Sequence, residues 1–405
     1  MEPASQPLAA GGPERLDLGA VWRRFLPDFL AAHPRLPARV RRILQRMSLC
    51  RSGALGHTVY RCQSCGQRQA LPLGCGDRHC PGCQASQARH WLEQQLRWLL
   101  PVPYFHLVFT LPRPLHPLLL WNQAALYKLL FQAASESLLE MARSRWRGTP
   151  GFIVVLHTWG QQLNYHPHLH VIITAGALSD DGQQWHRPKQ THYLFPEAAL
   201  AALFRGKFLA GLRSAVGAGP ACRPLQLRWP KGLSAKALQP LYQTKWRVYL
   251  KRPFGGPEQV LRYLAHYTHR VAIANSRLRA IDAPKGTVRF AYRDYADGSR
   301  SKTLELSGIE FITRFCRHLL PPGFTKIRHY GILGNNRKVT AIPQARLLLH
   351  SRSTLKLLLG LLALQTAPRP APMQCPHCQT GAMRWEALVT PWGTWRVRPR
   401  LNDSS

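Results

Sequence analysis

The chain has 405 residues, which is enough for two or three domains of about 100 to 200 residues each. Its 55 Lys and Arg residues outnumber its 19 Asp and Glu residues, so the formal net charge is +36. Such a surplus indicates a polyanionic partner, and nucleic acid is the first candidate. No apolar stretch reaches the roughly 18 residues that span a membrane, and the N-terminus lacks the basic-then-apolar order of a signal peptide. The composition therefore predicts a soluble intracellular protein with no membrane partner.

Residues 1–48 are predicted to form a basic helical leader. From Val21 to Met47 apolar residues recur at helical spacing among many arginines, and Pro34 and Pro37 divide this run into two helices. We interpret the leader as an accessory arm that contacts DNA.

Cysteines crowd into the segment that follows, which contains six of the ten in the chain. In a reducing compartment this crowding favours metal binding over disulfides. Two Cys-x-x-Cys pairs, Cys62 with Cys65 and Cys80 with Cys83, have a spacing typical of a tetrahedral zinc site. We predict that these four thiolates hold a structural zinc ion in a DNA-binding module over residues 49–98. Four protein ligands leave no position for substrate, so the module should orient DNA without performing chemistry.

Further sulfur and nitrogen ligands near these pairs leave open a second zinc site or a different choice of four ligands. They are Cys50, His57, Cys75 and His79. A basic tail over residues 333–405 contains one more pair, Cys375 and Cys378, with no second pair downstream. Alone, that pair is only a weak indication of metal binding, and its role stays open.

Strands and helices interleave in residues 99–332, which we assign to the main domain. The strand YFHLVFTL precedes a helix from about Asn122 to Arg147, and FIVVLHTW and HLHVIITAGAL then form a predicted antiparallel hairpin. Two more strands, TVRFAYRDY and KTLELS, lead into a helix that ends before Pro321 and Pro322. This mixture of hairpins and helices predicts an α+β fold.

The second strand of the hairpin carries a histidine pair. His168 and His170 are separated by one residue, so both imidazoles project from one face of the strand while Leu169 points to the core. With His166 nearby, the pair predicts a site for a divalent metal ion. No thiolate lies close in sequence, so Mg²⁺ or Mn²⁺ is the expected ion, which would polarise a phosphate as a Lewis acid.

A third ligand is needed, and three residues are candidates. His157 and Gln161 belong to the first strand of the hairpin and the turn after it, and His266 belongs to a later helix. The sequence does not decide among them.

That later helix carries two tyrosines. Tyr263 and Tyr267 are four residues apart, so the two phenols lie on one helical face within reach of a common phosphate. Aromatic residues at this spacing are often core residues, but basic neighbours argue against a wholly buried face. Arg262 and Arg270 are the neighbours that we expect to contact DNA. A tyrosine hydroxyl that displaces one DNA strand forms a covalent 5′-phosphotyrosine and leaves a 3′-OH, which conserves bond energy for rejoining.

Together these motifs resemble the rolling-circle transposases of the insertion-sequence ninety-one type, within the histidine-hydrophobe-histidine (HUH) tyrosine endonucleases. The resemblance rests on six segments in the expected order, which are CRSGALGHTVYRCQSCG, CGDRHCPGCQ, PVPYFHLVFTLP, LHTWGQQLNYHPHLHVIITAGAL, KRPFGGPEQVLRYLAHYTHRVAIAN and FTKIRHYGIL. Most of the chain is covered by it.

The resemblance implies a fold, a site and an activity. An N-terminal zinc-binding module would precede an HUH endonuclease domain, whose central antiparallel sheet is flanked by helices and has the tyrosine helix beside it. His168 and His170 would be metal ligands, and Tyr263 and Tyr267 nucleophiles, of a metal-dependent nickase and ligase. The partner would be DNA, mainly single-stranded or hairpin element ends, in the bacterial cytoplasm near the nucleoid.

Two other functions share parts of this pattern. A plasmid replication initiator or relaxase uses the same chemistry but usually carries a helicase domain, and no phosphate-binding GxxxxGK[ST] loop occurs here. A non-catalytic zinc-dependent DNA-binding protein from a decayed element would need only the charge and the cysteines. Because the histidine and tyrosine motifs are complete, the sequence favours the transposase.

Overall fold

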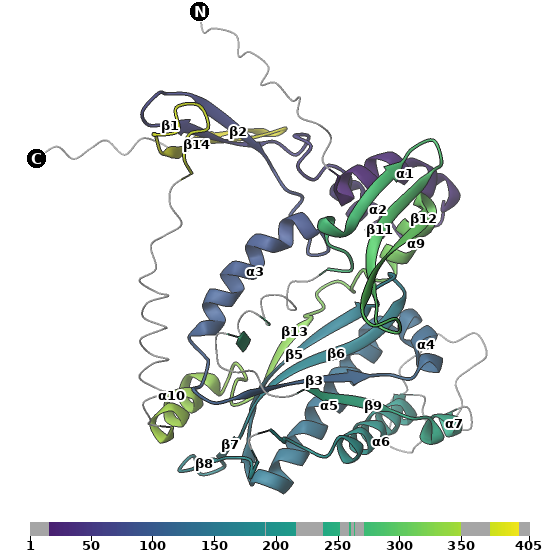
Figure 1. Ribbon diagram of the computed structural model, residues 1–405, viewed down its shortest axis with the longest axis vertical. Helices are drawn as coiled ribbons and strands as arrows, with labels where there is room; N and C mark the ends of the chain where they lie inside the picture. Colours follow the sequence, from purple (N-terminus) through teal and green to yellow (C-terminus); the bar gives the residue numbers. More distant parts are fainter. Residues whose placement is uncertain are drawn as a thin grey trace, which may run out of the picture. The chain divides into compact units, whose positions relative to one another are not determined.

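The computed structural model describes most of the chain (Figure 1). The described residues are 16–190, 192–215, 238–251, 259–260, 263, 271–349 and 373–396. The chain divides into two compact units, and each unit is discontinuous in sequence. The first unit consists of Met1–Ser86, Ile273–Cys316 and Thr366–Ser405, and the second of Gln87–Ala272 and Arg317–Gln365.

This division differs from the linear order of domains that the sequence predicts. Residues 273–316, which the sequence assigns to the main domain, cluster with the cysteine-rich segment and the tail. The physical reason is aromatic packing inside the first unit, where the ring of Trp22 lies 4.9 Å from that of Phe315 and 6.0 Å from that of Phe311. Domain boundaries at residues 98 and 332 therefore do not coincide with the units of the structure.

The basic leader forms the two expected helices, α1 (Leu18–Ala32) and α2 (Ala38–Ser48). The Asp17 side chain caps α1 by accepting a hydrogen bond of 2.9 Å from the Ala20 amide. Although the leader is rich in arginine, the apolar face of α1 is buried, and Trp22 is fully covered. Helix α1 is therefore part of the core of the first unit and does not extend from it as an arm.

Two antiparallel sheets complete the first unit. One has the strand order β10-β11-β12 and the other the order β15-β14-β1-β2. The second sheet joins distant parts of the chain, because β1 pairs with β14 over six residue pairs. The elements are β1 (His57–Cys62), β2 (Arg68–Pro72), η3 (Asn275–Arg277), β10 (Leu278–Asp282), β11 (Thr287–Asp294), β12 (Arg300–Ser307), α9 (Gly308–Cys316), β14 (Met383–Thr390) and β15 (Gly393–Arg396).

An antiparallel sheet in the order β13-β5-β6-β3-β9 forms the centre of the second unit. Its β5–β6 hairpin confirms the pairing predicted from sequence, with Leu156 opposite Leu169 and His157 opposite His168. The strands are β3 (Tyr104–Thr110), β5 (Gly151–Trp159), β6 (Tyr165–Thr174), β9 (Arg247–Lys251) and β13 (Ile327–Gly331).

The two faces of this sheet differ in what covers them (Figure 1). One face packs on α5 (Gln123–Trp146) and α6 (Glu197–Ala215) and forms the larger core, because alternate strand residues such as Leu169 point to it. Within the described residues, the other face packs on α10 (Lys338–Leu348), on the end of α3 (Pro81–Leu96) and on Val260. This α+β arrangement of an antiparallel sheet flanked by helices confirms the predicted fold class.

The remaining elements connect these layers. They are α3 (Pro81–Leu96), η1 (Arg113–Leu115), α4 (His116–Trp121), β4 (Gly148–Thr149), β7 (Ala177–Ser179), β8 (Trp185–His186) and α7 (Gln239–Gln243). Among the helices in the described ranges, none is long and apolar enough to cross a bilayer.

We expect Leu169→Ala to lower the free energy of unfolding by about 2 to 5 kcal/mol, because the side chain is fully buried and its loss leaves a cavity. Urea unfolding followed by tryptophan fluorescence measures the change. Val339→Ala is the control, since Val339 is 64% exposed and its truncation should change stability by no more than about 0.5 kcal/mol. Equal effects of the two substitutions would contradict the assignment of Leu169 to the core.

Candidate functional site: a histidine cluster and two thiolate clusters

Three histidines come together on the partly covered face of the central sheet. His157 on β5 lies opposite His168 on β6, and His170 projects from the same face two residues further along. Each offers one nitrogen, and these atoms all lie within 4.8 Å of one another. The Nε2 atoms of His168 and His170 are 3.1 Å apart. Three convergent imidazoles can bind one metal ion.

The backbone orients one of these imidazoles. His168 Nδ1 lies 2.7 Å from the carbonyl oxygen of His166, to which an Nδ1–H donates. That tautomer leaves Nε2 with its lone pair directed into the cluster. The neighbouring carbonyl therefore fixes the ring in the orientation that a metal ligand needs.

Burial controls the charge of the cluster. It lowers the pKa of His168 to about 4 and holds the pKa of His170 well below its ordinary value. Both imidazoles are therefore neutral near pH 7, which is the state in which a histidine nitrogen binds metal.

A fourth histidine, His106, extends the cluster and was missed by the sequence analysis. It projects from β3, and its Nε2 lies 2.9 Å from Nδ1 of His170. Burial lowers its pKa to about 3, so it too is neutral. The signal was available in YFHLVFTL, because alternation places His106 on the face opposite to Phe105 and Leu107.

The Tyr263 side chain contacts this extended cluster. Its hydroxyl lies 2.6 Å from Nε2 and 2.9 Å from Nδ1 of His106, and the two rings are 4.6 Å apart. Gln259, Val260 and Tyr263 are helical, as the sequence predicts for this segment. One hydrogen-bonded chain can thus connect the Tyr263 hydroxyl to Nδ1 of His106, and Nε2 of His106 to His170.

Five further predicted site residues remain. Gln161 lies in the turn between β5 and β6. Tyr267, His266, Arg262 and Arg270 lie outside the described residues.

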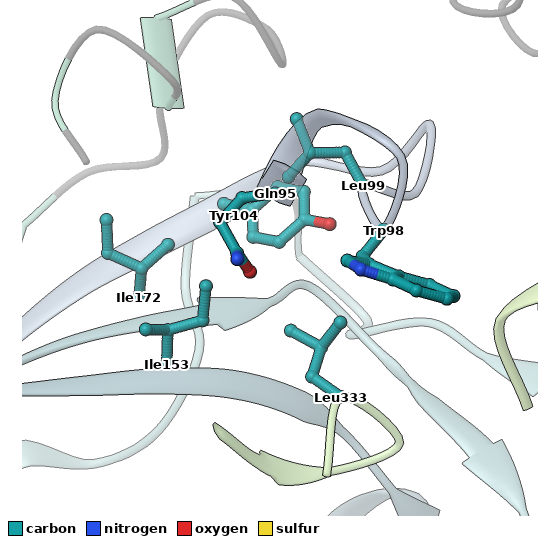
Figure 2. Close-up of a pocket in the computed structure, with 7 residues that line it drawn as sticks. All are labelled: Gln95, Trp98, Leu99, Tyr104, Ile153, Ile172 and Leu333. Carbon is teal, nitrogen blue, oxygen red and sulfur yellow. The ribbon is translucent and has the colours of Figure 1, made fainter. Parts of the chain in front are cut away.

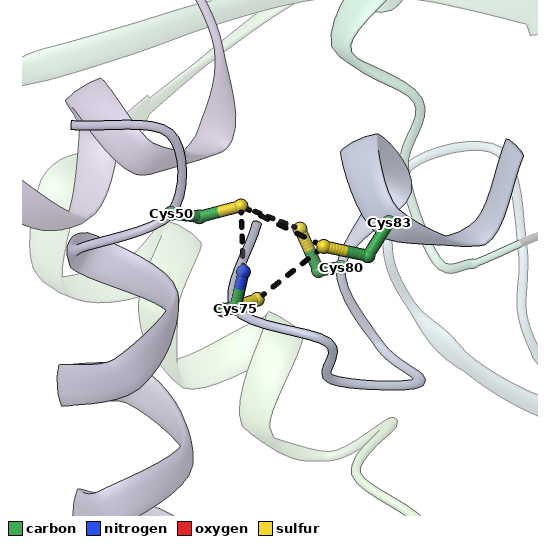
Figure 3. Close-up of side chains that lie close together, drawn as sticks. All are labelled: Cys50, Cys75, Cys80 and Cys83. Atoms are coloured by element: carbon green, nitrogen blue, oxygen red, sulfur yellow. Dashed lines mark hydrogen bonds between the residues drawn. The ribbon is translucent and has the colours of Figure 1, made fainter. Parts of the chain in front are cut away.

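The cysteines form two clusters, which corrects the predicted set of four. Cys62 and Cys65 do not lie with Cys80 and Cys83, because the first pair ends β1 and the second begins α3. Cys80 and Cys83 instead lie with Cys50 and Cys75, as Figure 3 shows. Cys62 and Cys65 lie with Cys375 and Cys378 of the tail.

The cluster of Cys50, Cys75, Cys80 and Cys83 has the dimensions of a tetrahedral thiolate site. The sulfur of Cys50 is 3.6 Å from that of Cys80 and 3.7 Å from that of Cys83, and Cys75 is 3.7 Å from Cys83. Four sulfurs bound to one zinc ion at about 2.3 Å lie about 3.8 Å apart. Two of these ligands, Cys50 and Cys75, were named only as alternatives by the sequence.

The two histidines named with them are not ligands in this cluster. The Nδ1 of His79 lies 2.8 Å from Oδ1 of Asp77, and hydrogen bonding to His79 lowers the pKa of that carboxyl against the effect of burial. His57 belongs to β1, where it pairs with Val389 and Pro72. The sequence left open an alternative set of ligands that included these two histidines. In the structure, that set consists of cysteines alone.

A cavity of about 10 Å³ lies near the end of α3, and it is too small for a substrate (Figure 2). It is lined by Gln95, Trp98, Leu99, Tyr104, Ile153, Ile172 and Leu333. Most of these side chains belong to the core on the α10 side of the sheet, so the cavity is a packing defect.

Histidines on an antiparallel sheet, with a helical tyrosine in contact with them and in a chain this basic, are typical of a protein that acts on nucleic acid, and comparison with known families specifies the class. A family model described as "Transposase zinc-binding domain" matches residues 21–111. A second, described as "Putative transposase", matches residues 151–340. No solved structure matches the chain.

Two curated relatives match over most of their length. "Putative transposase y4qJ" of Sinorhizobium fredii is 43% identical over 346 residues, which cover 84% of this chain and 85% of that protein. "Transposase for insertion sequence element IS801" of Pseudomonas savastanoi pv. phaseolicola is 30% identical over 298 residues, covering 72% of this chain and 69% of that protein. The chain belongs to the IS91 family of transposases, which makes it a DNA-binding enzyme that cuts and transfers strands.

We expect Cys50→Ser to lose one equivalent of zinc per chain and to lower the melting temperature, because a structural zinc ion contributes directly to folding. Elemental analysis by mass spectrometry and a thermal melt measure the two effects. Cys316→Ser is the control, since Cys316 lies in α9 outside both clusters. A Cys50→Ser protein with the zinc content of the unsubstituted chain would show that Cys50 is not a ligand.

Proposed function

We propose that this transposase nicks and rejoins single-stranded DNA through a 5′-phosphotyrosine on Tyr263, in a rolling-circle-like transposition. The observation that carries the proposal is the contact between the Tyr263 hydroxyl and His106, which itself contacts His170 of the histidine cluster. A nucleophile and a set of metal-binding groups within one hydrogen-bonded network is the arrangement that covalent phosphoryl transfer requires.

The histidine cluster is the proposed site of a divalent metal ion. His157, His168 and His170 would hold it, and His157 is favoured as the third ligand because its nitrogen lies within 4.8 Å of the other two. Of the two expected ions Mn²⁺ suits three nitrogen donors better, because Mg²⁺ prefers oxygen ligands. When bound, the ion would polarise the scissile phosphate and stabilise its developing charge.

The covalent step exchanges one phosphodiester bond for another. The Tyr263 oxygen forms a bond to phosphorus while the bond from phosphorus to the 3′ oxygen breaks, and the phenolic proton ends on that departing oxygen. The product is a protein joined to the 5′ end of one fragment and a free 3′-OH on the other. Because no phosphate bond energy is lost, attack by a 3′-OH reverses the step and joins strands.

His106 is proposed as a positioning residue for Tyr263. Its pKa of about 3 makes the imidazole a poor proton store near pH 7, so it orients the phenol by hydrogen bonding and does not keep the proton. If His170 binds metal through Nε2, its Nδ1–H donates to His106 Nε2, and the same residue then supports both the nucleophile and a ligand.

DNA is attracted to this site by charge. The net charge of +36 favours binding to any nucleic acid and does not select a particular form. We propose that single-stranded or hairpin element ends are preferred because they expose one phosphodiester to Tyr263. Arg262 and Arg270 would contact the backbone beside it. A closed thiolate site has no open position for substrate, so the cysteine clusters would orient the DNA.

We expect Tyr263→Phe to reduce covalent adduct formation at least about a thousandfold, because the substitution removes the attacking oxygen. The assay uses a single-stranded oligonucleotide from the end of the protein's own element, Mn²⁺ and a 3′ label, so that the labelled fragment stays on the protein in a denaturing gel. Tyr193→Phe, at an exposed position, should react normally.

Tyr267→Phe tests which of the two tyrosines attacks the DNA. Loss of the adduct from both single variants would indicate joint action, whereas a normal adduct from Tyr263→Phe would move the nucleophile to Tyr267. An adduct that survives in the double variant, or its absence from the unsubstituted protein, would overturn the phosphotyrosine mechanism.

We expect His106→Ala to lower the single-turnover rate of adduct formation about 10- to 100-fold, with little change in oligonucleotide affinity, because it removes the orientation of Tyr263. His106→Gln keeps an N–H donor for the phenol and should recover part of the rate. His157→Ala, by contrast, should weaken Mn²⁺ binding measured by titration calorimetry. A normal rate in His106→Ala would remove the positioning role.

A further inference from the structure

We propose that Cys62, Cys65, Cys375 and Cys378 form a second structural zinc site, which joins the cysteine-rich module to the tail. The family model for the zinc-binding domain matches residues 21–111 and so does not reach the tail pair. The site would take Zn²⁺ through four thiolates, separately from the cluster that contains Cys50.

The distances fit a tetrahedral ion. The sulfur of Cys62 is 3.7 Å from that of Cys378, and the sulfur of Cys65 is 3.7 Å from that of Cys375. All four sulfurs lie within 4.8 Å of one another. The edge expected for four sulfurs around zinc is about 3.8 Å. A disulfide requires sulfurs about 2.05 Å apart, so the separations match shared coordination and not two cross-links.

The two Cys-x-x-Cys pairs have the same backbone turn. The Gly66 amide donates to the Cys62 carbonyl at 3.1 Å, and the Gln379 amide donates to the Cys375 carbonyl at 2.9 Å. Both donors follow the first cysteine of their pair by four residues, and both have left-handed backbones, with φ of 72° and 58°. A left-handed conformation is unfavourable for Gln379, so its occurrence at the matching position indicates that the knuckle shape is required.

Backbone amides point at the sulfurs of both pairs. The Ser64 amide lies 3.4 Å from the sulfur of Cys62, and the Gly381 amide lies 3.3 Å from the sulfur of Cys378. Such N–H groups stabilise the negative charge of a thiolate, which is the form that binds zinc. A Cβ at Gly381 would overlap the sulfur of Cys62, so the close approach of the two pairs depends on glycine there.

The scaffold brings the two pairs together but has little core of its own. β1 and β14 pair from His57 with Val389 to Cys62 with Met383, with a register shift between Val59 and Tyr60. Among the described residues, the hydrophobic cluster here has Met383, Cys62 and Cys375 buried, with Tyr60 and Cys378 partly buried against them. So small a core needs a further source of stability, and zinc supplies it in modules of this size.

One ion pair adds specificity to this sheet. Arg68 on β2 donates to both carboxylate oxygens of Glu386 on β14, at 2.6 Å and 2.9 Å. The pair is partly exposed, so it contributes little to stability and mainly favours one register of the strands. Arg68 is therefore engaged within the protein.

The site also couples the tail to the start of the chain. The two halves are 310 residues apart, so the ribbon of β1, β2, β14 and β15 is complete only when nearly the whole chain has been synthesised. A chain that lacks the tail would keep the Cys50 cluster and lose this ribbon.

We test the site with the full-length double variant Cys375→Ser/Cys378→Ser. The expected zinc content falls from two equivalents per chain to one, measured by elemental mass spectrometry, and Cys316→Ser keeps two. Two equivalents in the double variant, or a single equivalent in the unsubstituted protein, would overturn the proposal. Tyr263→Phe should keep both equivalents, so failure of the zinc site and failure of the proposed nuclease chemistry are distinguishable.

A second measurement needs no substitution and so does not depend on folding of a variant. The unsubstituted protein is alkylated before and after chelation of zinc, and the modified cysteines are mapped by peptide mass spectrometry. Cys375 and Cys378 should be protected until zinc is removed. Complete alkylation of both in the zinc-loaded protein would overturn the proposal.

Discussion

The alternation of side chains along β6 is the constraint on which the candidate site depends. Leu169 and Val171 point to the helix-covered core, so His168 and His170 must point to the opposite face. The same period places His157 of β5 on that face. A shift of one residue in the β5–β6 register would turn the histidines toward the helix-covered core and Leu169 toward the opposite face, so burial of the core also fixes the position of the histidine nitrogens.

The site combines neutral groups with a strongly positive protein. Burial keeps the imidazoles of His106, His168 and His170 uncharged near pH 7. The surplus of +36 charges that attracts DNA therefore belongs to other residues, mainly arginines. Attraction of the phosphate backbone and the proposed binding of a metal ion are thus assigned to different groups, because the sheet holds unprotonated nitrogens in a basic chain.

The first unit is assembled from three separate stretches of sequence. Aromatic packing of Trp22 on Phe315 brings residues 273–316 to the leader, and strand pairing of β1 with β14 brings the tail to the cysteine-rich segment. Both interactions join residues that are far apart in sequence. Closing such long loops slows folding more than it lowers stability. Thiolate clusters suit such an architecture, because an ion holds distant segments together where the local core is small.

The sequence by itself determined the features that depend on local geometry. Spacing within one strand or turn predicted the hairpin, the common face of His168 and His170, and the Cys-x-x-Cys pairs, because neighbouring residues are related by a fixed backbone period. Only the tertiary structure decided which pairs are partners. His106 lies 64 residues from His170, and Cys65 lies 310 residues from Cys375. Their contacts depend on strand order and packing between distant segments, and no local spacing contains that information.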